Sequence, residues 1–348
     1  MVYCTLFGSN YLDKGMTMID SLLDVSPDSI VYVLCMDDLT LQALNRFYLF
    51  SVHTISLEEF EDGELKLIKN NRTFAEYCWT STAKLIRYVI KKGIDRCTYI
   101  DADLFFYRNP DCLIEEMTNQ KCTVQVVPHR FPNNKRGRIQ EKESGKNCVQ
   151  FNTFTNSDDS IELLEQWIRQ CVEECSLENG GDQKYTDSWG QLTFVNVSKN
   201  GGAGIAPWNI TRFRRVKNKI LTVFDVEEKK EYDLVFYHFQ NVTSLDKYRI
   251  IIQPLLAYGR LDKELVKSLY HNYLRKLFAN KNLVEKEFGY LPIVTKYVSD
   301  LNDKDSFFKR VKRALKMKPS EILRKILYKK RFITRKKIAI FDIRNANK

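Results

Sequence analysis

The chain has 348 residues, of which 44% are hydrophobic and 28% charged, a composition that supports a large folded domain with a real core. No apolar run reaches the about 18 residues that a membrane-spanning helix needs, and the opening MVYCTLFGSNY lacks the basic and apolar stretches of a signal peptide. We therefore expect a cytosolic protein whose nine scattered cysteines are reduced thiols rather than disulfide partners or zinc ligands.

The net charge of +11 is concentrated near the end of the chain. From Lys309 onward there are 16 lysines and arginines against two acidic residues, so this segment carries +14 and the remainder −3. Apolar residues at helical spacing alternate with these cations, as in a helix that lies in a membrane interface. We expect residues 306–348 to hold the protein on the anionic cytoplasmic face of a membrane. A basic helix packed on the body is the alternative, and no RNA-binding motif indicates a nucleic-acid partner.

The first third of the chain alternates strand-like and helix-like segments. Apolar and β-branched runs predict strands at residues 2–7, 29–36, 53–57 and 97–100, and apolar residues at helical spacing predict helices at 11–23, 39–50 and 74–92. This order favours an α/β fold, with a mostly parallel, Rossmann-like sheet and helices on both faces. Ligands of such sheets bind beyond the carboxyl ends of the strands, so residues that follow a strand are candidates for function.

The rest of the chain is less regular. We predict strands at 122–127, 148–154 and 234–239, a helix at 157–174, loops rich in Gly and Trp at 180–189 and 201–208, and a helical, aromatic segment at 248–300. Functional residues are often carried by loops of this kind. We divide the chain into a catalytic α/β domain at 1–244, a helical extension at 245–305 and the basic amphipathic tail at 306–348.

Asp101 and Asp103 directly follow the short strand CTYI, in the stretch YIDADLFFYRN. Two carboxylates this close repel each other unless a cation lies beside them. Mg²⁺ or Mn²⁺ bound through oxygen would leave positions open for phosphate oxygens and would neutralise a departing diphosphate. The alternative is structural, with one Asp capping the next turn and the other paired with Arg108.

The longer stretch YIDADLFFYRNP resembles the DxD segment of GT-A glycosyltransferases that use nucleotide sugars, especially the family-8-like group and bacterial transferases of surface polysaccharide. The similarity runs in order along most of residues 1–245. VYCTLFGSNYLDKGMTMIDSL is similar to the opening strand and helix of that family, RTFAEYCWTSTAKLIRYVI to the helix before its metal motif, and CVQFNTF, GGDQKY and YHFQN to later sugar and metal elements. The resemblance implies a GT-A fold and transfer from a nucleoside diphosphate sugar.

The resemblance also implies a metal site made by Asp101, Asp103 and His238. His238 lies in YHFQN, where the family has an H-F-x-G element that supplies a histidine to the metal. This chain has Asn241 in place of the usual glycine, which affects the phosphate contact of that loop and not the metal contact. A mixed oxygen and nitrogen ligand set suits Mn²⁺ at least as well as Mg²⁺. A structural histidine at a strand end is the alternative.

Further residues are implied to hold the donor, a UDP-sugar. Asp182 would bind sugar hydroxyls and Gln183 would lie near the anomeric carbon, where the preceding glycines allow the backbone to approach a ligand closely. The other candidates are Tyr3, Thr5 and Asp37 for the nucleotide, Arg72 and Lys84 for the diphosphate charge, Asn152 for the donor sugar, and Trp208 and Asn209 for an acceptor wall. An ordinary structural role, such as a turn or a core anchor, is the alternative for each.

We therefore expect a metal-dependent glycosyltransferase that moves a hexosyl unit from a UDP-sugar to a glycan or lipid-linked glycan. The family-8-like resemblance implies retention of anomeric configuration. Neither a nucleophile nor an inverting base is evident, and a front-face route, in which the leaving phosphate accepts the proton of the acceptor, needs neither. Two other classes stay open. A phosphohydrolase or phosphotransferase with an Asp nucleophile also places D-x-D after a strand, although such enzymes usually have Thr where Phe105 stands. A non-catalytic, membrane-associated scaffold would bind neither nucleotide nor metal.

Overall fold

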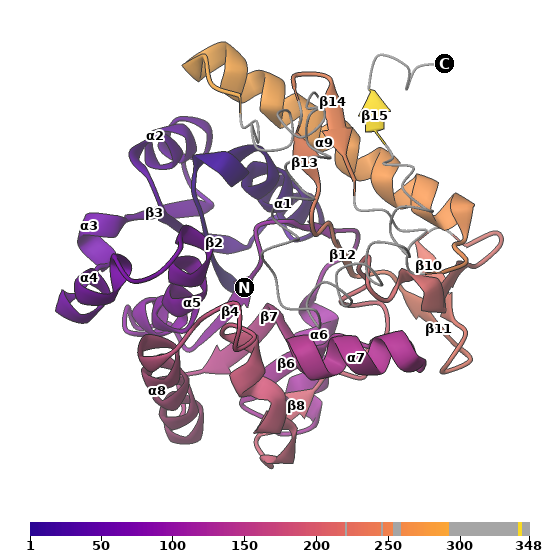
Figure 1. The fold of residues 1–348 in the computed structure, drawn as a ribbon, viewed down its shortest axis with the longest axis horizontal. Coiled ribbons are helices and arrows are strands. Elements are labelled where there is room, and N and C mark those ends of the chain that lie inside the picture. The colour runs from indigo at the N-terminus through magenta and orange to yellow at the C-terminus, as the bar shows by residue number, and fades with distance from the viewer. Residues whose placement is uncertain (220, 245, 253–258, 292–339, 343–348) are drawn as a thin grey trace, which may run out of the picture.

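The computed structural model describes residues 1–219, 221–244, 246–252, 259–291 and 340–342. Within them a seven-stranded sheet runs in the order β3-β2-β1-β4-β7-β6-β8 (Figure 1). Its strands are β1 (Val2–Phe7), β2 (Ile30–Cys35), β3 (Val52–Ser56), β4 (Arg96–Ile100), β6 (Val124–Pro128), β7 (Asn147–Thr155) and β8 (Val195–Val197). The pairs β4–β7 and β7–β6 are antiparallel and the other four are parallel, which confirms the predicted α/β class with a mostly parallel sheet.

The sheet is buried on both faces, as the near-continuous apolar strands predict. Successive side chains of a strand point to opposite faces. In β1, Cys4 and Leu6 therefore join one hydrophobic cluster, whereas Tyr3 and Phe7 join another. Apolar layers therefore pack on both faces of β1, and only the carboxyl end of this strand faces a cavity.

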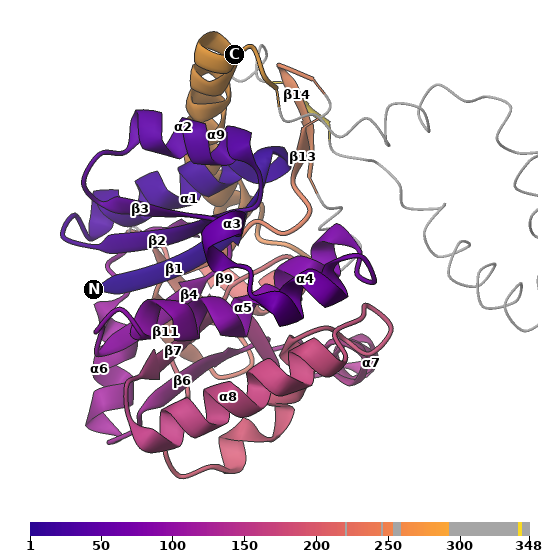
Figure 2. The same cartoon turned by 90° about the vertical axis from the view of Figure 1, so that its left-hand side faces the viewer.

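Helices cover both faces of the sheet. They are α1 (Leu12–Val25), α2 (Asp38–Phe47), α3 (Leu57–Phe60), α4 (Gly63–Lys69), α5 (Phe74–Ile90), α6 (Asp111–Asn119), α7 (Lys135–Ser144), α8 (Asp158–Glu173) and α9 (Lys263–Phe288), with 3₁₀ turns η1 (Ser9–Tyr11), η2 (Gln183–Gln191) and η3 (Ile210–Arg212). The helices α5 and α8 lie together in front of the sheet in Figure 2 and pack on the Cys4 side. On the Tyr3 side α1 lies against the sheet, with α9 packed on α1.

Local sequence explains where α5 begins. The Thr73 side chain accepts a hydrogen bond from the backbone N–H of Glu76, and the Glu76 carboxylate accepts one from the backbone N–H of Thr73. This capping box satisfies two of the N–H groups that a helix start leaves without partners. The inward face of the helix, which includes Leu85, Ile86 and Val89, is fully buried.

Three small sheets surround the cavity and the extension. They are β5 (Leu104–Phe106) with β12 (Phe236–His238), the group β9 (Phe213–Arg215), β10 (Thr222–Asp225) and β11 (Lys230–Asp233), and the group β13 (Thr243–Ser244), β14 (Arg249–Ile251) and β15 (Ile340–Asp342). Strand β14 corrects the helical prediction for 248–300. Its β-branched run pairs on both sides, with β13 and with β15, and a sequence pattern cannot show such distant partners.

The predicted helical extension contains α9, which is confirmed as a long helix beside α1 (Figure 1). Tyr273 of α9 stacks flat on Phe239, the residue after β12, with ring centroids 3.7 Å apart. The extension therefore shares a core with residues of the predicted catalytic domain. Among the described residues, none of the helices is long and apolar enough to cross a membrane.

Candidate active site

A cavity of about 680 Å³ opens over the carboxyl ends of β1 and β4. Leu6, Phe7 and Gly8 line it from β1, and Asp101 to Asp103 line it from the turn after β4. The cavity is also lined by Gly180 to Gln183, by Trp208 and by His238. This is the edge where ligands bind in open α/β sheets.

Strand pairing brings His238 to the Asp pair across 135 residues of chain. β12 runs antiparallel to β5, and His238 lies opposite Leu104, the residue after Asp103. The Phe239 backbone N–H also donates a 2.8 Å hydrogen bond to the Asp103 carbonyl. On the other side, the Asp101 N–H donates to the carbonyl of Gln150 in β7 at 3.1 Å. The backbone therefore holds these acids and the imidazole at one place.

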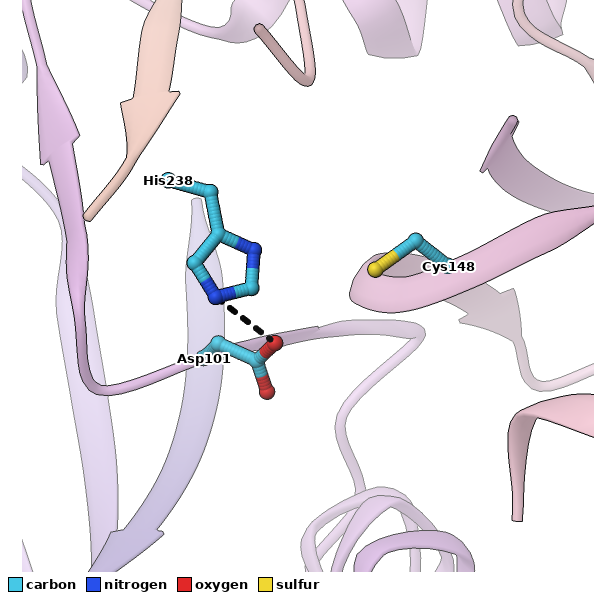
Figure 3. Close-up of side chains that lie close together, drawn as sticks. All are labelled: Asp101, Cys148 and His238. Carbon is cyan, nitrogen blue, oxygen red and sulfur yellow. Dashed lines mark ion pairs between the residues drawn. The ribbon is translucent and has the colours of Figure 1, made fainter. Parts of the chain in front are cut away.

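The imidazole of His238 faces both carboxylates. Its Nε2 lies 2.9 Å from Oδ1 of Asp103 and 3.8 Å from Oδ2 of Asp101, the contact drawn in Figure 3. Its Nδ1 lies 2.9 Å from Oε1 of Gln150, which can only accept, so Nδ1 carries a hydrogen. In the neutral ring Nε2 is then the free ligand atom, and it points at the acids.

The charges of this cluster are strongly coupled. Burial raises the pKa of Asp101 to about 6, with His238 opposing the rise and Asp103 adding to it. Burial also acts to raise the pKa of Asp103, but the charge and hydrogen bond of His238 hold it below its usual range. Burial would lower the pKa of His238, yet Asp103 raises it well above the ordinary value. A positive charge is thus favoured between the carboxylates, and a divalent cation fits the same requirement.

Cys148, at the start of β7, completes a close group that sequence reasoning missed. One donor atom each of Asp101, Cys148 and His238 lies within 4.8 Å of the others. All nine cysteines are free thiols, as predicted, and Cys148 is the one that lies close to the predicted metal ligands Asp101 and His238 in the described part of the chain. Gln150, two residues later, was missed as the partner of Nδ1. The only indication in the sequence that Cys148 and Gln150 lie near the site was the prediction that their strand borders it.

Asp182 and Gln183 line the cavity across from the Asp pair. Gly180 and Gly181 precede them with φ of 84° and 66°, and a Cβ on Gly181 would stand 3.1 Å from the Trp79 ring. Burial raises the pKa of Asp182 well above its ordinary value, and the neighbouring Cys175 and Asp101 add to this. The raised pKa favours the protonated form of Asp182, which is the form that can donate a hydrogen bond.

The structure does not bring Tyr3 and Thr5 to the cavity. Both are fully buried within β1, and their side-chain oxygens have no hydrogen-bond partner in the described part of the chain. Neither residue lines the cavity, because packed neighbours cover both side chains, and their contact with the nucleotide stays a prediction. Leu6, Phe7 and Gly8 are the β1 residues that a ligand could reach.

Arg72 and Lys84 are also engaged away from the cavity. The Arg72 guanidinium donates to the carbonyls of Cys171 and Val172 near the end of α8. The Lys84 ammonium lies 2.7 Å from carboxylates of both Asp62 and Glu64. Neither side chain lines the cavity, so the prediction that they offset a diphosphate is not supported. The Lys84 ammonium pairs with nearby carboxylates instead, and the Arg72 guanidinium pairs with nearby carbonyls.

Asp37 and Asn152 border the site without lining it. Asp37 caps α2, and its second oxygen accepts a 2.7 Å hydrogen bond from the N–H of Ser9, next to the cavity residue Gly8. Asn152 lies on β7 opposite Tyr99 with 1% of its surface exposed, and both of its amide atoms lack a partner among the described residues. Neither side chain lines the cavity, so the contacts of Asp37 with the nucleotide and of Asn152 with the sugar stay predictions.

Trp208 and Asn209 differ from each other in role. Trp208 lines the cavity and meets the His238 ring edge-on, with centroids 5.2 Å apart. Asn209 is fully buried and donates to the carbonyls of His129 and Gly204, so it holds the loop rather than forming an acceptor wall. Asn241 lines the cavity with φ of 62°, a left-handed conformation that Asn tolerates better than most residues, which explains how it replaces the family's glycine.

The chain is an α/β protein. At the carboxyl edge of its sheet, carboxylates and an imidazole form a cluster of a kind that can bind a cation. No family model matches the chain. The uncharacterized protein YfnD of Bacillus subtilis (strain 168) is 30% identical over 285 residues, covering 79% of this chain and 88% of YfnD. YfnF of the same organism is 28% identical over 303 residues, covering 82% and 96%. The chain belongs to the family of YfnD.

Several solved structures align with part of this chain. Mouse xyloside xylosyltransferase 1 aligns with a TM-score of 0.44 at 14% identity, covering 69% of this chain and 98% of that chain. The galactosyltransferase LgtC, in complex with donor and acceptor sugar analogs, aligns with 0.45 at 10% identity, covering 80% and 96%. The glycosyltransferase GlyE of Streptococcus pneumoniae TIGR4 aligns with 0.45 at 14%, covering 83% and 63%. At these scores we take no functional conclusion from them.

Proposed function

We propose that this chain is a glycosyltransferase that moves a hexosyl unit from a UDP-sugar to a glycan or lipid-linked glycan acceptor, aided by Mn²⁺ or Mg²⁺. The observation that carries the proposal is the convergence of Asp101, Asp103 and His238 on one side of a cavity whose other side holds Asp182 and Gln183. A GT-A assignment agrees with the mostly parallel sheet and with the motif order of the sequence.

The donor set fits a divalent ion. Two carboxylates and an imidazole nitrogen offer a mixed oxygen and nitrogen set of the kind that suits Mn²⁺ and Mg²⁺. Gln150 holds the imidazole with Nε2 toward the acids. When bound, the ion would neutralise the charge that develops on the leaving diphosphate.

The remaining residues position the sugar. Gly180 and Gly181 let the backbone approach the ligand, and Asp182, which lines the cavity, can hydrogen-bond to a sugar hydroxyl. Gln183 has an uncharged amide and therefore cannot act as a base. In a front-face route the departing phosphate takes the proton of the acceptor, so the reaction needs no protein base and retains the configuration. Rate enhancement then comes mainly from orientation and electrostatic stabilisation.

Calorimetry with UDP tests this function. We expect UDP to bind to the wild-type chain only when Mn²⁺ is present, and we expect Asp103→Asn to abolish that binding because it removes one ligand charge. Asp28→Asn, at an exposed turn, is the matched control and should bind as wild type does. UDP binding that is indifferent to Mn²⁺, or unchanged in Asp103→Asn, would contradict the assignment. A phosphorylated aspartate after incubation with a phosphate ester would instead indicate a phosphotransferase.

We also propose that residues 306–348 hold the enzyme on the cytoplasmic face of an anionic membrane. The support is the net charge of +14 from Lys309 onward and the helical spacing of the apolar residues between these cations. A lipid-linked acceptor would then meet the cavity from the membrane surface.

A further inference from the structure

Cys148 lies beside the two residues that any ion in this cavity would use. Its Sγ, a carboxylate oxygen of Asp101 and a ring nitrogen of His238 are all within 4.8 Å of one another. Figure 3 shows the sulfur, the imidazole and the carboxylate turned toward the same space. We propose a second, softer mode of metal binding at this site, in which Cys148 takes the place of Asp103 as third ligand, an inference that rests on the proposed function.

The spacing suits a single ion. Zn–S bonds are about 2.3 Å and Zn–N and Zn–O bonds about 2.0–2.2 Å, so two donors of one tetrahedral ion stand roughly 3.5 Å apart. One ion bound by all three side chains would therefore draw the donor atoms about 1 Å closer together than the 4.8 Å limit of this group. Three protein ligands with an open fourth position are the arrangement of zinc sites that bind a water or a substrate.

The two modes differ in the metals that they favour. Asp101, Asp103 and His238 offer two oxygens and one nitrogen, which suit Mn²⁺ and Mg²⁺. With Cys148 the set becomes oxygen, nitrogen and sulfur, which favours Zn²⁺, Co²⁺ and Cd²⁺. Because both sets need Asp101 and His238, the two kinds of ion exclude each other. Zn²⁺ is therefore a competitor of Mn²⁺ in this cavity.

The surroundings of Cys148 favour coordination over exposure to solvent. Its side chain packs with Ala206, Trp208 and Phe131, and only 5% of its surface is exposed. A thiolate with so little contact to water is stabilised by a directly bound cation, and its proton is released to solvent when the ion binds. Among the described residues, this is the one group of three such side chains with donor atoms this close.

Co²⁺ provides a direct probe of the sulfur ligand. The metal-free full-length protein is titrated with Co²⁺ under anaerobic conditions, and the near-ultraviolet absorption is followed. We expect a thiolate-to-cobalt charge-transfer band that saturates at one equivalent and is absent in Cys148→Ser. Cys122→Ser, which changes a partly buried thiol on another edge of the sheet, should keep the band. A missing band in wild type, or one that survives in Cys148→Ser, overturns the proposal.

Zn²⁺ affinity gives a second measurement that does not depend on absorption. In competition with a chromophoric chelator, Cys148→Ser should bind Zn²⁺ more than about tenfold more weakly, since even changes outside the ligand shell cost 10–100-fold. Circular dichroism checks that the variant is folded. Equal Zn²⁺ affinities would also refute the sulfur ligand. If wild type shows the cobalt band but no Mn²⁺-dependent UDP binding, the proposed function fails and the thiol site stands. The reverse result refutes the thiol site alone.

Discussion

Gln150 decides which nitrogen of His238 is free to act. Its Oε1 accepts from Nδ1–H at 2.9 Å, so Nε2 is left for the two carboxylates or for an ion. Partners that orient a metal-binding histidine in this way commonly affect affinity nearly as much as the ligands do. Gln150 is a positioning residue, because it acts on the ion only through the imidazole.

We predict that Gln150→Leu weakens Mn²⁺ binding by roughly 10–100-fold, because nothing then fixes the His238 tautomer. Gln150→Glu should preserve binding, since a carboxylate also accepts from Nδ1–H. Mn²⁺ titration followed by electron paramagnetic resonance measures the affinity, and ¹⁵N NMR of the imidazole reports the tautomer. A Leu variant with normal affinity and a normal ¹⁵N pattern would show that Gln150 only fills space.

His129 provides a pH-dependent contribution to stability. It is buried, stacks on Phe131 with centroids 4.7 Å apart, and its pKa is lowered by burial to about 4. A histidine with a lowered pKa stabilises the fold fully above its unfolded pKa of about 6.5, and this stabilisation is lost as pH falls toward 4. The full difference corresponds to about 3 kcal/mol.

We predict that lowering the pH from 7 to 4 reduces the free energy of unfolding less in His129→Phe than in wild type. The substitution keeps the aromatic contact with Phe131. Urea unfolding at several pH values measures the two free energies of unfolding. The difference between the free energies of unfolding of wild type and variant should narrow or reverse as the pH falls, because the variant has no imidazole to protonate. Parallel curves for the two proteins across this range would contradict the role of His129.

At the scale of elements, α9 contacts the α/β domain through polar and aromatic pairs. Asn280 donates a 2.8 Å hydrogen bond to Asp20 on α1, whose other oxygen accepts from the hydroxyl of Tyr48. At its other contact, Tyr273 stacks on Phe239, directly after the site strand β12. The extension thus supports the strand that carries His238 rather than standing apart from it.

We predict that Asn280→Ala lowers the free energy of unfolding by about 1–3 kcal/mol, because a partly buried carboxylate oxygen of Asp20 loses its donor. Asn282→Ala, at an exposed position of the same helix, is the matched control and should be neutral or slightly stabilising because Ala has the higher helix propensity. Denaturant unfolding of both variants measures the difference. If both substitutions changed the free energy of unfolding by the same amount, α9 would dock on α1 through its apolar face alone.

At the scale of the whole molecule, charge separates the body from the segment that begins at Lys309. The body carries −3 and this segment +14, so the two would respond oppositely to an anionic surface. Each basic residue near such a surface contributes about 1 kcal/mol, and salt screens that attraction. Orientation of the protein on a membrane would follow from this asymmetry.

We predict that the protein sediments with vesicles of anionic lipid and not with vesicles of neutral lipid, and that added salt releases it. Replacing Lys309, Arg310, Lys312 and Arg313 with Gln should weaken this binding markedly while leaving Mn²⁺-dependent UDP binding intact. Co-sedimentation measures the first effect and calorimetry the second. Unchanged sedimentation of the substituted protein would refute the membrane role of this segment.

Much of the site was predictable because it follows strands directly. Asp101, Asp103 and His238 end apolar runs, and the glycines before Asp182 mark a loop that a ligand can approach closely. The structure places all four acidic and basic side chains around one cavity. The strands of the sheet were also predicted, except the three-residue β8, since residues buried on both faces produce apolar runs. Strand β14 was not, because its neighbours are distant in sequence.

The sequence by itself determined the alternation of strands and helices and the polar residues that end the strands, since both depend on neighbours along the chain. Only the tertiary structure decided which side chains face the cavity. Tyr3 and Thr5 are covered by packed neighbours, Arg72 is taken by carbonyls of α8, and the antiparallel register of β7 beside β4 brings Cys148 and Gln150 to the acids. Contacts across a sheet depend on strand order and register, which local patterns do not encode.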